Sequence, residues 1–306
     1  MQTITFVLAG TMLAATPLLI AALGELIAEK SGILNLSVEG MMALGAAIGF
    51  IVVMETGSYW LAFLAGGLVS TLLAALFGAV VLLALGNQVA TGLAVGILGV
   101  GLAALIGKPY ESKTVPPMPR MPIPFLSDIP VIGPGLFNHV VLVYLAPLAA
   151  LGLWWLFRYS KLGLIIRAVG ESPEASHAIG HNVMLVRLLA VLAGGFLAGV
   201  AGAFISVAST TLWSDGMIAG RGWIVVALVV FGTWRVGRVM IGAYLFGIAS
   251  IAELLVQSTG IGVPSQLLTS IPYVATIVAI ALLSMDGRRI RLNAPVSLGR
   301  VYREAQ

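Results

Sequence analysis

Three polar residues follow one another closely at the start of an apolar stretch, in residues 31–42 (SGILNLSVEGMM). Asn35, Ser37 and Glu39 alternate there with apolar residues. An ionisable group at membrane depth costs roughly 2.5–3.5 kcal/mol to insert, and it usually faces the interior of a helical bundle. The pattern therefore predicts an irregular stretch in which Glu39 lines a pathway or belongs to a buried structural pair. Alternatively, Asn35 and Ser37 cap a helix near the membrane interface while Glu39 lies among headgroups.

A second polar segment, GESPEASHAIGHN, has the signals of a short helix. Ser172 is a good N-cap, Pro173 a good first helical residue and Glu174 a favourable charge in the first turn. Gly180 supplies a C-terminal stop. Because an isolated helix at 173–179 would be marginal in water, we expect it to dock against something. The alternative is an interfacial helix that only closes a loop.

Other polar residues interrupt the apolar runs and are candidates for a translocation pathway. Glu253 and Gln257 are spaced i, i+4 and so share one helix face. Asn87 and Gln88 lie where one apolar run ends and the next begins. The alternative for such residues is a bond between neighbouring helices.

Nucleotide, metal and catalytic motifs are not found in the sequence. The chain has no cysteine, and its three histidines are scattered, so no metal site is expected. No G-x-x-x-x-G-K-[ST] motif is present to hold ATP phosphates. We expect no catalytic residues and no enzyme activity, so energy for any transport comes from a partner or from an ion gradient.

The composition places these residues in a membrane protein. Of the 306 residues, 59% are apolar and 9% charged, and the mean hydropathy is +1.07. An ordinary soluble domain is about 45–50% apolar and about 25% charged. This balance excludes a cytosolic enzyme, a disordered protein and a nucleic-acid reader, and it predicts an all-α, polytopic transmembrane bundle.

Runs of about 20 apolar residues are long enough to cross a bilayer as helices. A shorter run at 222–234 is expected to be re-entrant or broken. We therefore expect eight full spans plus one or two half-spans. The predicted spans are 4–24, 37–54, 59–85, 89–107, 139–157, 187–208, 239–257 and 269–285.

Charge indicates the orientation of these spans, because Lys and Arg collect in cytoplasmic loops. The basic segment 158–187 and the basic tail at 291–306 are therefore expected in the cytoplasm. The proline-rich segment 108–138 is expected to form an external, extended loop without helix. Counting back five full spans places the N-terminus outside, whereas an extra half-span near 25–37 places it inside.

Small residues spaced four apart suggest closely packed helices. Such pairs are Gly45/Gly49, Gly92/Gly96, Gly195/Gly199 and Ala198/Gly202.

The short-helix segment also carries a resemblance. Glu174, Ala175 and Ser176, followed after three residues by Gly180, resemble the EAA-x3-G loop of ABC importer permeases. Ser176 stands in place of the second Ala, and the distal I-x-L-P part of the pattern is absent. The run GELIAEKSGILNLSVEGMMALGA is similar to nucleoside-type permeases of the ribose/nucleoside branch, which work with a basic-membrane-lipoprotein type binding protein. The resemblance covers about residues 20–285.

This resemblance implies a single permease domain at 1–290, with a cytoplasmic basic tail at 291–306. It implies a multi-pass subunit of the bacterial cytoplasmic (inner) membrane. The segment 158–187 would carry a coupling helix that contacts an ATPase. The residues implied in coupling are Ser172, Pro173, Glu174, Ala175 and Gly180.

The implied partners are cytoplasmic ATPase subunits, a second permease subunit in a homo- or heterodimer, an extracytoplasmic substrate-binding lipoprotein and membrane lipid, without nucleic acid. This chain would bind no cofactor, since ATP and magnesium belong to the ATPase. The implied solute is a nucleoside or similar small polar molecule, with a simple sugar or riboflavin as alternatives. A different class remains open, an ion-coupled secondary transporter that uses Glu39 or Glu253.

Overall fold

The computed structural model describes residues 2–258 and 293–302, together with residues 267, 270, 274 and 278. The predicted span at 269–285 and the tail beyond residue 302 therefore lie largely outside the described residues.

Within the described residues, seven helices are long and apolar enough to cross a membrane. They correspond to the first seven predicted spans and confirm the all-α class, whereas an eighth span is not confirmed. These helices are α1 (Gln2–Lys30), α2 (Val38–Thr56), α3 (Tyr59–Gly78), α4 (Gln88–Gly107), α6 (Val141–Tyr159), α9 (Val183–Phe204) and α11 (Val236–Ser258).

Short elements extend or connect these spans. A single turn of wider helix continues α3 (η1, Ala79–Leu83) and α9 (η3, Ile205–Ser209), and a tighter turn continues α4 (η2, Lys108–Tyr110). Strands β1 (Met121–Pro122) and β2 (Asn138–His139) pair antiparallel. The remaining helices are α5 (Ile132–Leu136), α7 (Lys161–Glu171), α8 (Pro173–Ala178) and α10 (Arg221–Phe231).

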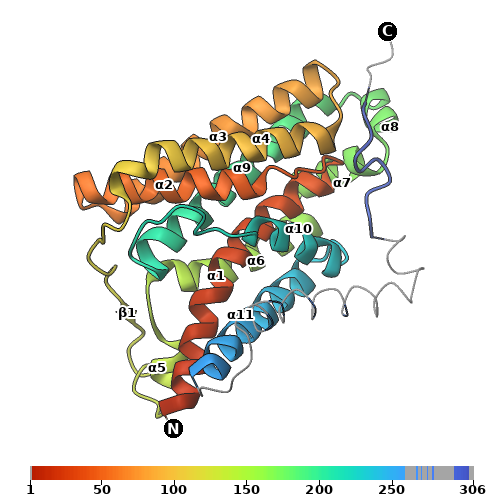
Figure 1. The fold of residues 1–306 in the computed structure, drawn as a ribbon. Helices are drawn as coiled ribbons and strands as arrows, with labels where there is room; N and C mark the ends of the chain where they lie inside the picture. The colour runs from red at the N-terminus through yellow and green to blue at the C-terminus, as the bar shows by residue number, and fades with distance from the viewer. Residues whose placement is uncertain are drawn as a thin grey trace.

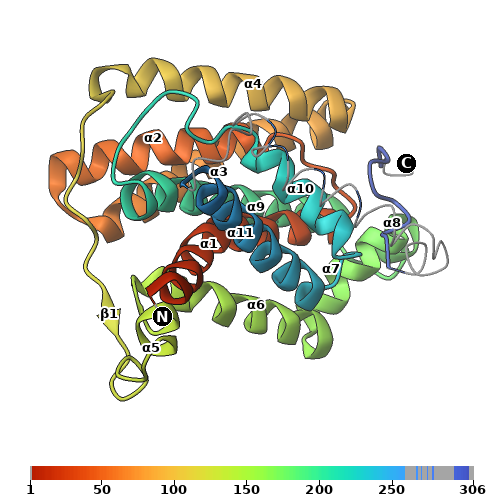
Figure 2. The ribbon, with the colours of Figure 1, turned by 60° about the horizontal axis from the view of Figure 1, so that its bottom comes forward.

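The connecting elements gather at two opposite ends of the bundle (Figures 1 and 2). Helices α7 and α8 and the segment 293–302 lie at one end, whereas α5, β1 and the N-terminus lie at the other. We call the first the basic end, because α6, α7 and the α10–α11 connection place Arg158, Arg167 and Arg235 there.

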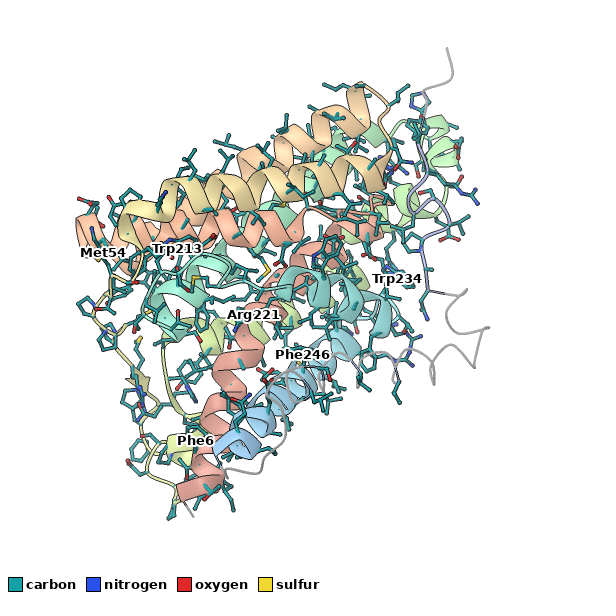
Figure 3. The ribbon with its side chains drawn as sticks, in the orientation of Figure 1. Phe6, Met54, Trp213, Arg221, Trp234 and Phe246 are labelled. Atoms are coloured by element: carbon teal, nitrogen blue, oxygen red, sulfur yellow. The ribbon has the colours of Figure 1, made fainter. Side chains whose placement is uncertain are left out.

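The short apolar run at 222–234 forms helix α10, which is shorter than a full span. Its 11 residues rise about 17 Å, which is too short for a hydrocarbon core about 30 Å thick. Residues 210–220 join η3 to α10 without regular helix. Arg221, the first residue of α10, lies between the two ends in Figure 3, where Trp234 marks the basic end and Phe6 the other.

Two helices differ from the sequence expectation. Helix α1 continues to Lys30 rather than ending near residue 24, so it includes two glutamates. Helix α7 was not predicted within the basic loop. The Ser160 hydroxyl accepts a hydrogen bond from the Gly163 N–H at 3.0 Å, and this cap begins the helix.

The expectation of a helix-free external loop is also partly wrong. Helix α5 contains Pro134, and the tight turn η2 contains Pro109. Both prolines lie in the first turn of a helix, where the backbone N–H has no intrahelical partner to lose.

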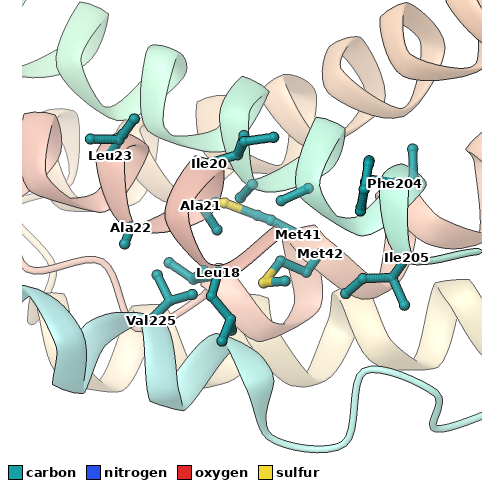
Figure 4. Packing of buried hydrophobic residues seen from close by; sticks show 14 of the residues in the cluster. Leu18, Ile20, Ala21, Ala22, Leu23, Met41, Met42, Phe204, Ile205 and Val225 are labelled. Atoms are coloured by element: carbon teal, nitrogen blue, oxygen red, sulfur yellow. The ribbon is translucent and has the colours of Figure 1, made fainter. Parts of the chain in front are cut away.

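The core forms where α9 packs against α1, α2 and α3. Figure 4 shows Met41 and Met42 of α2 beside Phe204 and Ile205, with Leu18 of α1 nearby. All five side chains are buried.

Several of the predicted small residues lie at close helix contacts, whereas Gly92 packs against Leu36 of the connection between α1 and α2. A Cβ atom added to Gly45 would overlap the backbone of Gly199, and one added to Gly49 would lie 2.5 Å from the Cβ of Ala203. A Cβ atom added to Gly202 would overlap the Met42 carbonyl oxygen. Backbone therefore meets backbone between α2 and α9, and side chains larger than hydrogen are excluded there.

We expect Gly202→Ala to destabilise the protein by about 1–3 kcal/mol, because the added methyl group meets backbone that cannot rotate away. The matched control is Gly101→Ala in α4, where an added Cβ has nothing within 4 Å. Thermal unfolding of detergent-solubilised protein should show a lower Tm for the first variant alone. Equal shifts in both variants would contradict the close packing of α2 and α9.

Candidate functional site

The segment 31–37 is the buried, non-helical connection between α1 and α2. Two of its backbone N–H groups are satisfied by side chains from other elements. The Leu34 N–H donates to Gln88 Oε1 at 2.8 Å, and the Asn35 N–H donates to Glu25 Oε1 at 3.2 Å. Because buried donors need acceptors, both side chains hold this segment in place.

Further bonds hold the rest of this segment. Asn35 Oδ1 accepts from the Ser37 N–H at 3.0 Å and also from the Ser37 hydroxyl. Asn35 Nδ2 lies 3.6 Å from the Met41 sulfur. The polar atoms of Asn35 and Ser37 therefore contact their own chain.

Glu39 bridges α2 and the start of α10. Its Oε1 accepts the Gly220 N–H at 2.7 Å, and its Oε2 accepts the Gly222 N–H at 2.6 Å. A carboxylate is favourable at a helix N-terminus, where the first N–H groups have no partner within the helix. Glu39 thus links α2 to the short helix α10, and its partner is backbone rather than a second side chain.

Gln88 and Asn87 act at the start of α4. Gln88 is buried, and its Nε2 donates to the Arg300 carbonyl oxygen at 3.2 Å. Asn87 Oδ1 accepts from the Ala90 N–H at 3.0 Å and caps the helix. The structure thus brings Gln88 to the 31–37 segment, while Asn87 serves its own helix.

Glu253 and Gln257 lie far from this group. Gln257 Nε2 donates to Glu253 Oε1 at 3.1 Å on α11. Gly10 of α1 packs against the Ile251 side chain, so this part of α11 is level with the start of α1. Glu25, which binds the 31–37 segment, lies 15 residues after Gly10, and this length of helix rises about 22 Å. Glu253 and Gln257 are therefore near the opposite end of α1.

Sequence reasoning missed the buried pair Glu25 and Glu29 on α1. Glu29 Oε2 accepts from the Trp234 indole N–H, as Glu25 accepts from the 31–37 segment. Their second oxygens have no hydrogen-bond partner among the described residues. The signal was two carboxylates spaced i, i+4 directly after a predicted span, which indicates that the helix continues.

Arg187 is the largest fully buried side chain of the described chain, although we expected it as a loop charge. Its Nε donates to the Ser31 carbonyl at 3.1 Å, and its Nη2 to the Ser297 hydroxyl at 2.9 Å. The Ser297 hydroxyl donates to the Gly170 carbonyl at 2.7 Å. Arg187 therefore joins α9, the 31–37 segment and the segment 293–302.

Helix α8 confirms the predicted short helix and ends at Ala178. The Ser172 hydroxyl accepts from the Ala175 N–H at 3.3 Å, and Gly180 follows with φ +91°. The side chains of Pro173 and Ser176 are buried. The opposite face is open to solvent and comprises Glu174, Ala175, His177 and Ala178, and the C-cap residue Ile179 is also exposed.

The segment 293–302 supports α8 from behind. Both line a cavity of about 260 Å³, to which α8 and its N-cap contribute Ser172 and Glu174, and the segment contributes Ser297 and Tyr302. Arg187 closes the cavity from α9. Among the described residues, no cluster of three His, Asp or Glu side chains is placed to hold a metal ion.

One protein family matches nearly the whole chain. It is described as "Branched-chain amino acid transport system / permease component", and it matches residues 7–284. No solved structure matches.

Three relatives are similar over most of their length. The putative glucose ABC transporter permease protein TsgC13 of Haloferax volcanii is 39% identical, over 96% of both chains. The nucleoside ABC transporter permease protein NupC of Lactococcus lactis is 31% identical, over 92% of this chain and 93% of its own. The guanosine ABC transporter permease protein NupQ of Bacillus subtilis is 28% identical, over 98% and 97%.

We expect Glu39→Ala to destabilise the protein, because it leaves the N–H groups of Gly220 and Gly222 without their acceptor. The cost is about 1–3 kcal/mol for each unpaired buried donor. Glu39→Gln keeps one oxygen and should cost less. Glu55→Ala, at the other end of α2, is the matched control, since Glu55 is exposed. In detergent, Glu55→Ala should have the highest Tm of the three variants, Glu39→Gln a lower one and Glu39→Ala the lowest. Any other order contradicts the capping role.

Proposed function

Because the chain belongs to the permease component family of the branched-chain amino acid transport system, we propose that it carries solute inward across a cytoplasmic membrane. It is the permease subunit of an ABC transporter, and its relatives are transport components rather than ATPases. Membership of this family favours an ABC transporter over the alternative, an ion-coupled secondary transporter. Inward transport, the coupling site and the solute are our inferences.

The observation that carries the coupling proposal is the two-sided character of α8. One face is held by the chain itself, through buried Pro173 and Ser176, while the other face is open. The side chain of Ile179 is 71% exposed, which is unusual for an isoleucine in a polar loop. A short helix fixed from behind, with an apolar residue in front, fits a docking element for a partner subunit. We infer that the partner is the ATPase.

The charge distribution supports this orientation. Cations at one end of a membrane protein favour the cytoplasmic side for that end. The basic end would then face the ATPase, and α1 would begin outside. The cations at the basic end are Lys30, Arg158, Lys161, Arg167, Arg187, Arg235, Arg238 and Arg300.

The relatives suggest a solute class. The names of three of them give glucose, nucleoside and guanosine, which share a hydroxylated sugar ring. We infer that this chain transports a nucleoside or a simple sugar, delivered by an extracytoplasmic binding protein. A second permease subunit would complete the pathway, and ATP and magnesium would bind the ATPase.

The described pathway candidates would shape this route rather than touch the solute. The polar atoms of Glu39 and Gln88 bind backbone of this chain. Those of Asn35 and Ser37 bind each other, the Ser37 backbone and the Met41 sulfur. The 31–37 segment and the start of α10 are thereby fixed beside each other. Non-helical backbone at membrane depth is tolerated where it is buried in protein or lines a water-filled cavity.

We expect Ile179→Asp to abolish co-purification of the ATPase with the tagged, full-length permease, because it places a charge in the docking face. Phe125→Asp is the matched control. Phe125 is 88% exposed and lies in the loop at the opposite end. Both variants should insert and fold as the parent does. Retention of the ATPase by Ile179→Asp would contradict the role of α8, while leaving the permease assignment intact.

We expect cells that express the chain with its native partner subunits to accumulate radiolabelled guanosine or glucose. Excess nucleoside or monosaccharide should compete, because both present a sugar ring to the binding protein, and leucine should not. Competition by leucine or riboflavin alone would overturn the inferred solute class.

A further inference from the structure

A cavity of about 560 Å³ opens at the basic end, away from α8. Its walls come from the end of α1, the end of α6, α7, the connection from α10 to α11, and Asn293. Five of the residues that line it are cations: Lys30, Arg158, Arg167, Arg235 and Arg238.

The hydrogen bonds that these cations donate go to neutral oxygens. Lys30 Nζ donates to the Asn293 carbonyl at 2.9 Å, and Arg238 Nη1 donates to the Thr233 hydroxyl at 2.7 Å. Arg167 Nε donates to the Gly163 carbonyl at 3.3 Å. These contacts orient the side chains without neutralising them.

The nearest carboxylates offset only part of this charge. Glu29 and Glu171 attract Lys30, while Arg167 and Arg235 repel it. Glu29 is already held by the Trp234 indole. Among the described residues that line the cavity, five are cations and none is a carboxylate, so this lining has an excess of positive charge that favours an anion.

Part of the cavity wall is apolar and comes from two helices with apolar outer faces. Trp154 and Phe157 of α6 and Val236 of α11 form part of its wall, and α6 packs against α11. Both helices are candidate spans, and their outer faces carry exposed leucine and isoleucine. These residues are Leu148, Leu151, Ile241 and Leu245.

We propose that this cavity binds the headgroup of an anionic phospholipid. The phosphate would lie among the five cations, and the acyl chains would follow the outer faces of α6 and α11. Trp154 is half exposed at the rim, and tryptophan is typical of the level where headgroups meet hydrocarbon. Basic pockets between spans on the cytoplasmic side recognise such headgroups. A free phosphate would use the cations but would gain nothing from the apolar walls.

The bound lipid would also join two parts of the chain. Arg158 and Arg167 belong to the corner between α6 and α7, whereas Arg235 and Arg238 belong to the corner between α10 and α11. One phosphate between them relieves repulsion that otherwise pushes these corners apart. The inference stands on the cavity and does not depend on the role of α8.

Lipid titration of the purified, full-length protein, followed by native mass spectrometry, tests this proposal. We expect phosphatidylglycerol to bind at least as one retained molecule, and phosphatidylcholine of the same chain length to bind much more weakly. The variant Arg158→Gln/Arg167→Gln should weaken phosphatidylglycerol binding roughly fivefold for each charge removed. Both side chains are exposed, so the fold should persist.

The matched control is Arg120→Gln, which removes an exposed cation from the loop at the opposite end and should leave binding unchanged. Inorganic phosphate that competes as well as the lipid would identify a free-anion site and overturn the proposal. Equal binding of phosphatidylcholine, or undiminished binding by the double variant, would also overturn it. Arg158→Gln alone provides the same test if the double variant is unstable.

Discussion

The need to satisfy the backbone of the 31–37 segment organises this protein. A chain that leaves the helix inside a bundle exposes N–H and C=O groups that no water replaces, so other groups must bind them. Glu25, Asn35 and Gln88 accept the N–H groups of this segment, and Arg187 binds the Ser31 carbonyl. The Gly299 N–H donates to the Gly32 carbonyl at 3.3 Å. Elements α1, α4, α9 and the segment 293–302 are therefore held around one break.

The same constraint applies to the start of the short helix α10. Helix α10 begins inside the bundle, where its first N–H groups need an acceptor. The two carboxylate oxygens of Glu39, which follows the 31–37 segment in the chain, accept the N–H groups of Gly220 and Gly222. One non-helical segment is thereby fixed beside the other. The glycine contacts between α2 and α9 bring the backbones close enough for this arrangement, because a side chain at Gly202 would separate them. The open face of α8 and the cation-lined cavity both lie at the basic end, on separate parts of it.

The sequence predicts those parts of the fold that depend on local patterns. Apolar length identified the seven described spans, and the cap, proline and glycine of the short loop predicted α8 to within one residue. The roles of Glu39, Gln88 and Arg187 depend on partners more than 50 residues away, which no local pattern contains. Glu25 and Glu29 were missed because the hydropathy of α1 falls before the helix ends.

Hydrogen–deuterium exchange of the full-length protein in detergent tests the central claim most directly. We expect peptides covering 31–37 and 220–222 to exchange slowly, although neither segment lies within a long helix. A Gln88→Leu variant should expose the first peptide and leave the second protected, because Gln88 binds only the first segment. Fast exchange of both peptides in the unmodified protein would contradict the claim that buried side chains hold these breaks.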